Sequence, residues 1–234
     1  MCQPEPARTL VIMDEARVGD GQAATRRATP HPLVTSDAAN RWVRAMSWAV
    51  WLGCLALLTN LTTTAQLSGD EPVLLAARFA ISKLANAGVV WAGVSVLAGW
   101  LVRRPVQAAV AGVAAGEVAL LSHYLLGQLM HAPTSVIQGN EIWLLAAALF
   151  GAPLGLVGAA MRRPGPLGTL AALVVPLGAI AEPFVRGMFA TPAMLPWPDS
   201  ASSAVSGMLL VAVGLAASVR VLLRARRGQS PRPQ

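Results

Sequence analysis

The stretch that decides the fold is PVQAAVAGVAAGEVALLSHYLLGQLM, residues 105–130. Its only charged residue is Glu117, and most of its other side chains are apolar or small. An α-helix rises ~1.5 Å per residue, so a helix of this length crosses the ~30 Å hydrocarbon core of a bilayer. The stretch lacks the period-two alternation of a membrane β-barrel strand. It therefore predicts a transmembrane helix.

Runs of the same character lie on both sides of this stretch. Together they predict six helices, at Met46–Leu67, Leu84–Leu101, Val106–Met130, Ile142–Met161, Leu167–Met188 and Ser203–Leu223. The whole chain is 55% hydrophobic and 12% charged, about half the roughly 25% charge of a soluble domain. We therefore expect an all-α, polytopic membrane helix bundle with six transmembrane helices, in contact with the lipid bilayer.

The apolar runs also divide the chain into segments. Residues 1–40 are rich in Ala, Thr, Pro and Arg and lack sustained apolar periodicity, which predicts a disordered cytoplasmic tail without a secretory leader. Residues 41–224 form the expected six-helix transmembrane domain. Residues 225–234 form a basic cytoplasmic tail.

The basic residues predict the orientation. The formal charge is +7 and the isoelectric point is near 11.2, but the arginines lie at the ends of apolar runs, as membrane anchors do, so no nucleic-acid partner is expected. If both termini are cytoplasmic, only Arg78, Lys83 and Arg186 of the 18 basic residues fall outside. Cytoplasmic loops carry an excess of Lys and Arg. We expect a multi-pass protein of a bacterial cell membrane with both termini in the cytoplasm.

Two Arg-Arg-Pro segments suggest an internal repeat. A shift of 59 residues superimposes residues 103–105 on residues 162–164 and places His123 on Glu182. Three parallel helical hairpins beginning near residues 44, 103 and 162 would produce this pattern, and transporters are known to use parallel repeats. Equal spacing of turns imposed by one membrane thickness explains the shift as well, and both readings stay open.

Glu117 is the first candidate functional residue. It lies near the middle of its helix, where a carboxylate costs roughly 2.5–3.5 kcal/mol and usually faces the bundle interior or a watery cavity. His123 and Tyr124 follow on the same helix, and the reference pKa of His near 6.5 would let it titrate. Such a cluster suits a proton or cation path, whereas neutral side chains hydrogen-bonded between helices are the structural alternative.

Glu182 and Arg186 complete the candidate polar path. They stand four residues apart, which places an ion pair on one helix face, and a purely structural pair is the simplest interpretation. Pro176 and Pro183 interrupt the same helix, and Pro153 interrupts the preceding one. Broken helices free backbone groups that can line binding sites, although they also occur in inert membrane helices.

Small residues at four-residue spacing predict helix packing faces. They recur at Ala108, Gly112 and Gly116, and again at Gly151, Gly155 and Ala159. Small side chains let helix backbones approach closely in membranes. The sequence leaves open whether these faces join helices of one chain or of two.

Motifs for catalysis or metal binding are not found in the sequence. It contains no P-loop, no HExxH and no GxSxG pattern. Its two cysteines, Cys2 and Cys54, and its three histidines, His31, His123 and His131, lack metal-site spacing. We therefore expect no enzymatic activity, no cofactor and no metal.

Several motifs resemble one family. The residues concerned are Asn86-Ala87-Gly88-Val89-Val90-Trp91-Ala92-Gly93, Leu97-Ala98-Gly99, Arg103-Arg104-Pro105, Arg162-Arg163-Pro164-Gly165-Pro166 and Glu182-Pro183. Across about residues 44–224 the chain resembles a domain-of-unknown-function family of six-helix integral membrane proteins found mainly in actinobacteria. The resemblance implies a fold and a location, and it assigns no catalytic residue.

Two functions remain open. The first is a small transport or permease component whose polar path is lined by Glu117, His123, Tyr124, Glu182 and Arg186. The second is a non-transporting membrane scaffold or accessory subunit, in which these side chains only bond helices together. Either could form a homo-oligomer or join a membrane partner subunit. A cavity that reaches Glu117 would favour the first, and a closed apolar interior the second.

Overall fold

The computed structural model describes residues 32–61, 72–131, 139–189 and 197–228. All secondary structure in these ranges is helical, which confirms the expected fold class. The helices are α1 (Pro32–Asn60), α3 (Pro72–Ala85), α4 (Gly88–Val102), α5 (Pro105–Leu129), α6 (Glu141–Ala160), α7 (Pro166–Val185) and α8 (Asp199–Gly228). Helices α1, α5, α6, α7 and α8 are each long and apolar enough to span a membrane. Helices α3 and α4, bent by 41° at their break, meet the same criterion as a pair and make a sixth span if the pair crosses the membrane once; we call this pair the bent span. By length and composition the chain is a multi-pass membrane protein.

The second span differs from the expected single helix Leu84–Leu101. The chain leaves the helix at Asn86 and Ala87, and α3 extends back to Pro72. Asn and Gly are weak helix formers, and Asn86 and Gly88 flank the break. Residues 72–83 were missed because Arg78 and Lys83 interrupt the apolar run that defined the expected helix.

The first and last helices also exceed their expected bounds. Helix α1 begins at Pro32 instead of Met46 and ends at Asn60 instead of Leu67, so residues 32–40 of the expected tail are helical, while residues 1–31 lie outside the described ranges. An ion pair between Arg41 and Asp37, at 3.2 Å, joins successive turns of this extension. Helix α8 likewise continues to Gly228. Hydropathy reports only the apolar part of a helix, so polar turns beyond it escape detection.

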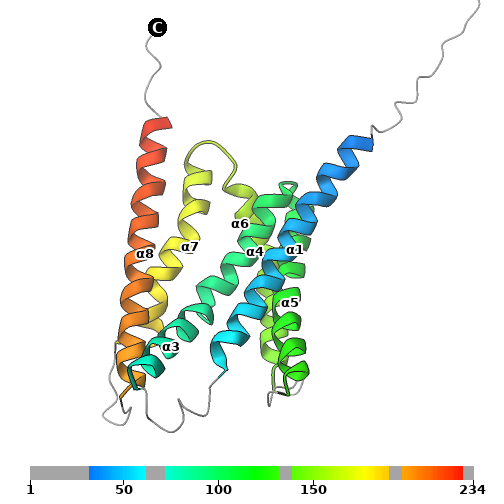
Figure 1. Cartoon of the computed structure of the whole chain (residues 1–234). Coiled ribbons are helices and arrows are strands. Elements are labelled where there is room, and N and C mark those ends of the chain that lie inside the picture. Colours follow the sequence, from blue (N-terminus) through cyan, green and yellow to red (C-terminus); the bar gives the residue numbers. More distant parts are fainter. Residues whose placement is uncertain (1–31, 62–71, 132–138, 190–196, 229–234) are drawn as a thin grey trace, which may run out of the picture.

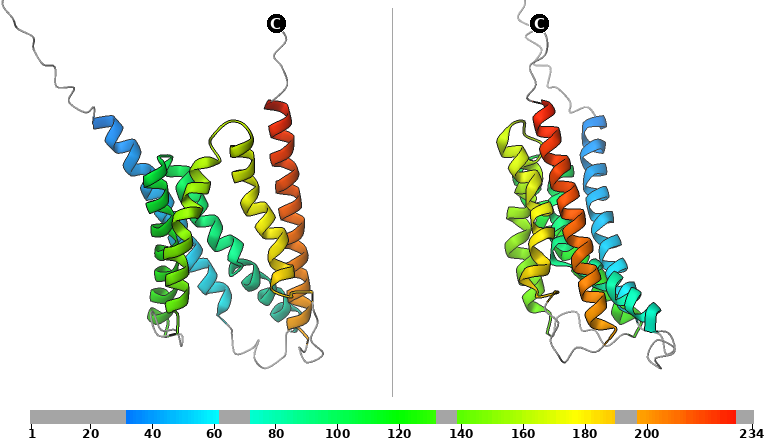
Figure 2. Two further views of the ribbon diagram at one scale, coloured as in Figure 1. Left: turned by 180° about the vertical axis from the view of Figure 1, so that it is seen from behind. Right: turned by 90° about the vertical axis from the view of Figure 1, so that its left-hand side faces the viewer.

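The helices form two groups. Helices α1, α4, α5 and α6 pack together, and α7 packs along α8 (Figure 1). Helix α3 lies against the first turns of α8 and leads into α4, so it joins the two groups (Figure 2). Both Arg-Arg-Pro turns lie at the same end of the bundle as the start of α1 and the end of α8, which we call the arginine end (Figure 1).

Partly buried polar contacts hold α3 to its neighbours. The ammonium group of Lys83 donates to the Asp199 carboxylate at 2.7 Å, to the Asp199 carbonyl oxygen at 3.1 Å and to the Ser203 hydroxyl. On the other side, the Arg78 guanidinium donates to the Leu61 carbonyl oxygen at 2.6 Å, at the end of α1. Carbonyl groups at a helix end have no partner within the helix, so such contacts satisfy them.

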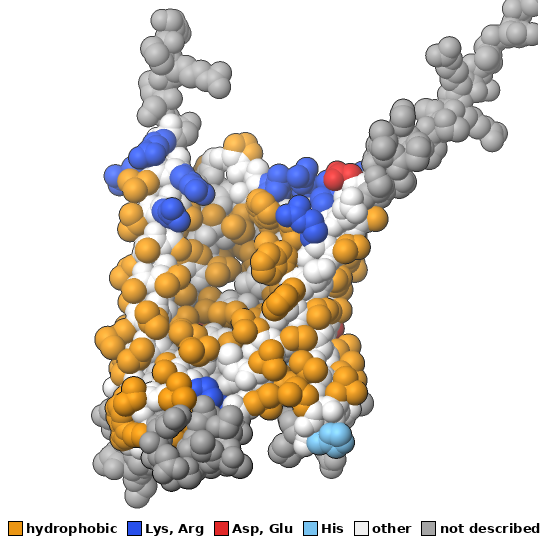
Figure 3. Space-filling view, viewed as in Figure 1, with side chains coloured by type: hydrophobic (Ala, Val, Ile, Leu, Met, Phe, Trp, Pro, Cys, Tyr) orange, Lys and Arg blue, Asp and Glu red, His pale blue; other side chains and the backbone are white. Residues whose placement is uncertain are grey.

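The outer surface of the bundle carries an apolar band between its two ends (Figure 3). Many large hydrophobic side chains are exposed there, among them Trp51 at 70%, Leu149 at 61% and Val213 at 64%. A monomer in water rarely exposes such extensive apolar surface. Lipid contact explains this surface, whereas the arginines gather at one end of it (Figure 3).

The expected small-residue faces are confirmed as packing faces between α5 and α6 of one chain. A Cβ atom at Gly155 would overlap the Ala108 carbonyl oxygen, and one at Gly112 would overlap the Gly151 carbonyl oxygen. The faces continue onto α4, where a Cβ atom at Gly99 would overlap the backbone of Gly155. This close approach of three helices builds the rigid part of the bundle.

Replacing Gly155 by Ala should therefore destabilise the protein by about 1–3 kcal/mol, the usual cost of overpacking. Gly93→Ala is the matched control, because a Cβ atom there meets nothing within 4 Å. Removing glycine from a helix gains up to about 1 kcal/mol, so the control should be neutral or stabilising. Thermal unfolding in detergent measures both variants, and equal melting temperatures would contradict the close approach.

Candidate functional site

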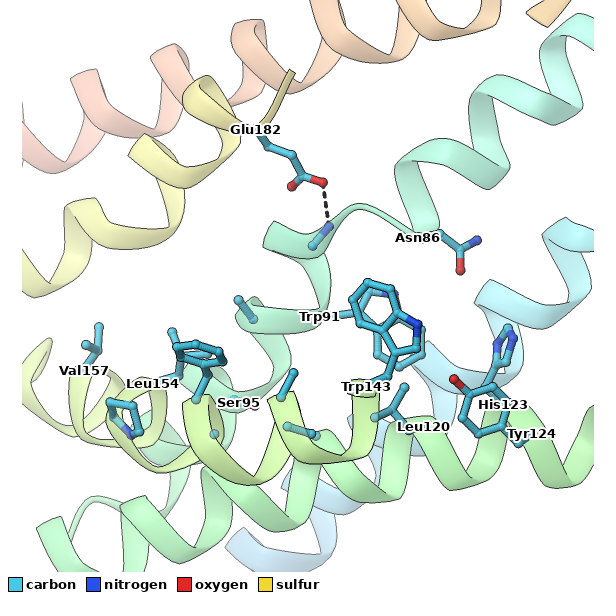
Figure 4. Close-up of a pocket in the computed structure, with 18 of the residues that line it drawn as sticks. Asn86, Trp91, Ser95, Leu120, His123, Tyr124, Trp143, Leu154, Val157 and Glu182 are labelled. Carbon is cyan, nitrogen blue, oxygen red and sulfur yellow. Dashed lines mark hydrogen bonds between the residues drawn. The ribbon is translucent and has the colours of Figure 1, made fainter. Parts of the chain in front are cut away.

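A cavity of about 940 Å³ borders both helical groups. It is lined mostly by α4, α5 and α6, and by Glu182 and Arg186 at the end of α7. Most of its wall is apolar. Leu154 and Val157 of α6 line one part, and His123 and Tyr124 of α5 line another (Figure 4). The cavity volume falls within the roughly 300–1,000 Å³ of small-molecule sites.

Glu182 reaches from α7 to the start of α4 (Figure 4). Its Oε1 atom accepts a hydrogen bond from the Gly88 amide at 2.7 Å, and its Oε2 atom accepts one from the Val89 amide at 2.8 Å. The first amides of a helix have no partner within it, and the helix dipole there attracts negative charge. Glu182 therefore caps α4 from a neighbouring helix, and its side chain is only 11% exposed.

Arg186 pairs with the same carboxylate, as the four-residue spacing predicts. Its Nη1 atom lies 3.1 Å from Glu182 Oε1, and the side chain is 48% exposed. This is one contact of a guanidinium group that carries five N–H donors. Arg186 lines the cavity with donors to spare.

His123 and Tyr124 lie together with Trp91 of α4. The ring centroids of His123 and Tyr124 are 5.3 Å apart and those of His123 and Trp91 are 6.0 Å apart, both in edge-on geometry. Nδ1 of His123 lies 3.3 Å from the Gly53 carbonyl oxygen. A carbonyl oxygen can only accept, so Nδ1 carries the proton and a neutral ring leaves Nε2 as an acceptor.

Two hydroxyl groups on the cavity wall are left without a partner among the described residues. Ser95 is 3% exposed and Tyr124 is 7% exposed, and both line the cavity. The Tyr124 hydroxyl lies on the side of its ring that faces Trp91 and Trp143 (Figure 4). Buried hydroxyl groups usually make hydrogen bonds, so a molecule in the cavity would supply what the protein does not.

Glu117 lies apart from the other four expected residues. It does not line the cavity, and its side chain is half-buried without a partner in the described part of the chain. One and two turns away on the same face, Leu121 and Val110 are 38% and 56% exposed. Glu117 therefore lies toward the outside of α5, and the cavity that would have linked it to a path does not reach it.

Other cavity residues were not singled out as sites from the sequence. From the sequence, Trp91 occurs only within a motif quoted for the family resemblance, and Trp143 has no predicted role. Asn86 donates to Asn60 Oδ1 at 3.0 Å and to the Ser82 carbonyl oxygen at 2.9 Å, tying the break after α3 to α1. Ser95 gave no signal, since a lone serine in an apolar run is common. No group of three metal-ligating side chains gathers within the described ranges.

Removing the Glu182 carboxylate should cost more stability than removing that of Glu117. Glu182→Ala leaves two amides of α4 without acceptors, and hydrogen bonds to charged groups contribute roughly 1.5–3 kcal/mol each. Glu117→Ala removes an unpaired carboxylate and should be neutral or stabilising. Thermal unfolding of both variants in nanodiscs tests this, and a larger loss for Glu117→Ala would refute the cap.

No family model, curated protein or solved structure matches the chain. The resemblance to six-helix actinobacterial membrane proteins stays a prediction.

Proposed function

We propose that the protein is a small transport component of the cell membrane that takes an amphipathic molecule into the cavity between its two helical groups. The observation that carries the proposal is the cavity itself, with apolar walls and a few polar groups gathered near Glu182 and Tyr124. Sites for small molecules combine these two properties. The polar path is formed by His123, Tyr124, Glu182 and Arg186, and Glu117 is left out of it.

The bent span supports a transport role over a passive one. In secondary transporters, discontinuous helices expose backbone ends at a binding site between two bundles. Here α4 begins at Gly88 on the cavity wall, and few contacts join α6 to α7 across the cavity. Movement of α7 and α8 relative to the other group would open the cavity, with α3 as the connection.

Two observations favour the alternative of a non-transporting scaffold or accessory subunit, and the first is that the cavity does not reach Glu117. Both oxygens of Glu182 are occupied by α4 amides, so this carboxylate already has a structural role. If the unpartnered hydroxyls bind only water, the cavity is a packing defect between two helical groups. A binding measurement followed by a flux measurement separates the two functions.

Binding is tested with three dyes that share one apolar body: 1-pyrenesulfonate, 1-pyrenemethanol and 1-pyrenemethylammonium. Tryptophan emission transfers to pyrene, so at least one dye should show saturable transfer in phosphatidylcholine nanodiscs that hold the protein. Ala146→Phe narrows the cavity and should weaken that binding about tenfold, a loss of ~1.4 kcal/mol. Ala148→Phe, on the exposed side of α6, is the matched control.

Saturable binding of none of the dyes would refute the proposed cavity function. Flux is measured in proteoliposomes with a quencher outside the vesicles. The quencher removes the fluorescence of external dye, so the fluorescence that remains reports the dye that has entered. The bound dye should cross faster than in empty liposomes, and the increase should disappear in Ala146→Phe. Binding without flux would favour the scaffold.

We also propose that the arginine end faces the cytoplasm, because short loops rich in Arg are retained there. In a background with Cys2→Ser and Cys54→Ser, Met130→Cys should react in intact cells with a maleimide that cannot cross membranes. Pro164→Cys should react only after the cells are opened. The reverse pattern would overturn the orientation, and labelling of both in intact cells would contradict the expected crossings.

A further inference from the structure

We infer that the ligand of the cavity is a small organic anion with a planar, ring-bearing apolar body. This inference rests on the proposed function and adds the chemical class of the molecule. It places the anionic head at Arg186 and the body against the aromatic wall formed by Trp91, Trp143 and Phe150.

The charge of the cavity wall favours an anion. Of the described lining residues, Glu182 is the only acid and Arg186 the only permanent base. Their ion pair balances one charge with one, and the start of α4 adds about half a positive charge at the same place. A His123 ring that donates through Nδ1 to Gly53 is either neutral or positively charged, so it adds no negative charge to the cavity. The net charge near the Glu182–Arg186 pair is therefore weakly positive.

The available hydrogen-bonding groups lead to the same conclusion. Glu182 accepts from Gly88, Val89 and Arg186, which leaves little capacity for a cationic ligand. Arg186 makes a single contact, to one carboxylate oxygen, so its remaining donors can bind a carboxylate or sulfonate head. The side-chain amide oxygen of Asn86 and Nε2 of a neutral His123 are acceptors, and they could bind a hydroxyl group of the same molecule.

The aromatic wall determines the shape of the body. Trp91 and Trp143 lie on facing helices at one part of the cavity (Figure 4). Phe150, two turns along α6 from Trp143, also lines the cavity. Flat rings pack edge-on or offset against such side chains and gain energy beyond the buried area. Ser95 and Tyr124 are residues more than nine-tenths buried. Their hydroxyl groups have no partner among the described residues and offer hydrogen bonds to polar substituents on the rings.

An anionic phospholipid shares the head chemistry but carries two flexible chains, for which a wall of rings has no special fit.

The three pyrene dyes decide between the classes in nanodiscs that contain the full chain. 1-Pyrenesulfonate should bind at least about tenfold more tightly than 1-pyrenemethylammonium, with 1-pyrenemethanol between them. Empty nanodiscs correct for partition of each dye into lipid.

Arg186→Gln should weaken sulfonate binding about tenfold and leave 1-pyrenemethanol unchanged, while Arg186→Lys should retain most of the affinity. Arg163→Gln, at the arginine end, is the matched control and should bind as the unaltered protein does. Thermal unfolding of Arg186→Gln shows whether the cap by Glu182 persists. Only variants with an unchanged melting temperature are compared.

Three outcomes would overturn the inference. Binding of the ammonium dye as tightly as the sulfonate would assign the cavity to cations or to neutral molecules while leaving the proposed function intact. Displacement of the sulfonate by phosphatidylglycerol in the nanodiscs, dependent on Arg186, would assign it to an anionic lipid. Failure of all three dyes would refute the proposed function itself.

Discussion

The backbone amides at the start of α4 impose the constraint on which the rest of the bundle depends. They lie inside a membrane protein, where an unsatisfied amide costs several kcal/mol because water is scarce. Glu182 supplies both acceptors, at 2.7 and 2.8 Å. Because the carboxylate comes from α7, the cap also fixes the distance between the two helical groups. A bent span and a neighbouring carboxylate are therefore one structural unit.

The bent span and Glu182 also explain the basic residues that lie away from the arginine end. Arg78, Lys83 and Arg186 are the three that fall at the end opposite the arginine end, and each has an assigned partner. Arg78 donates to the end of α1, Lys83 binds the start of α8, and Arg186 pairs with Glu182. Lipid-facing anchors elsewhere need no partner because they reach the interface. These three hold together the bent span and the helices it touches.

Much of the architecture was predictable from the sequence, because apolar runs and paired arginines report directly on a bilayer. Local spacing in the sequence predicts three features: the helix pair α5 and α6, the packing of Gly112 against Gly151, and the Glu182–Arg186 ion pair. The break at Asn86 was not predictable from spacing, since the acceptors for the amides that follow it come from Glu182, almost a hundred residues away. The direction of Glu117 was not predictable either, because a helix without marked amphipathicity does not show which face its neighbours cover.

Depth in the membrane is thus a weaker guide to function than the surroundings of a side chain. Glu117 lies near the middle of α5, yet it has no partner in the described residues and no cavity beside it. Glu182 lies near the end of α7, yet it joins two helical groups and borders the cavity. The 59-residue shift pairs Glu182 with His123, and both residues line that cavity. Where successive hairpins leave space between them, polar side chains at equivalent depths of the hairpins come together. The packing of hairpins alone would therefore place His123 and Glu182 on one cavity, even if the hairpin sequences share no ancestor.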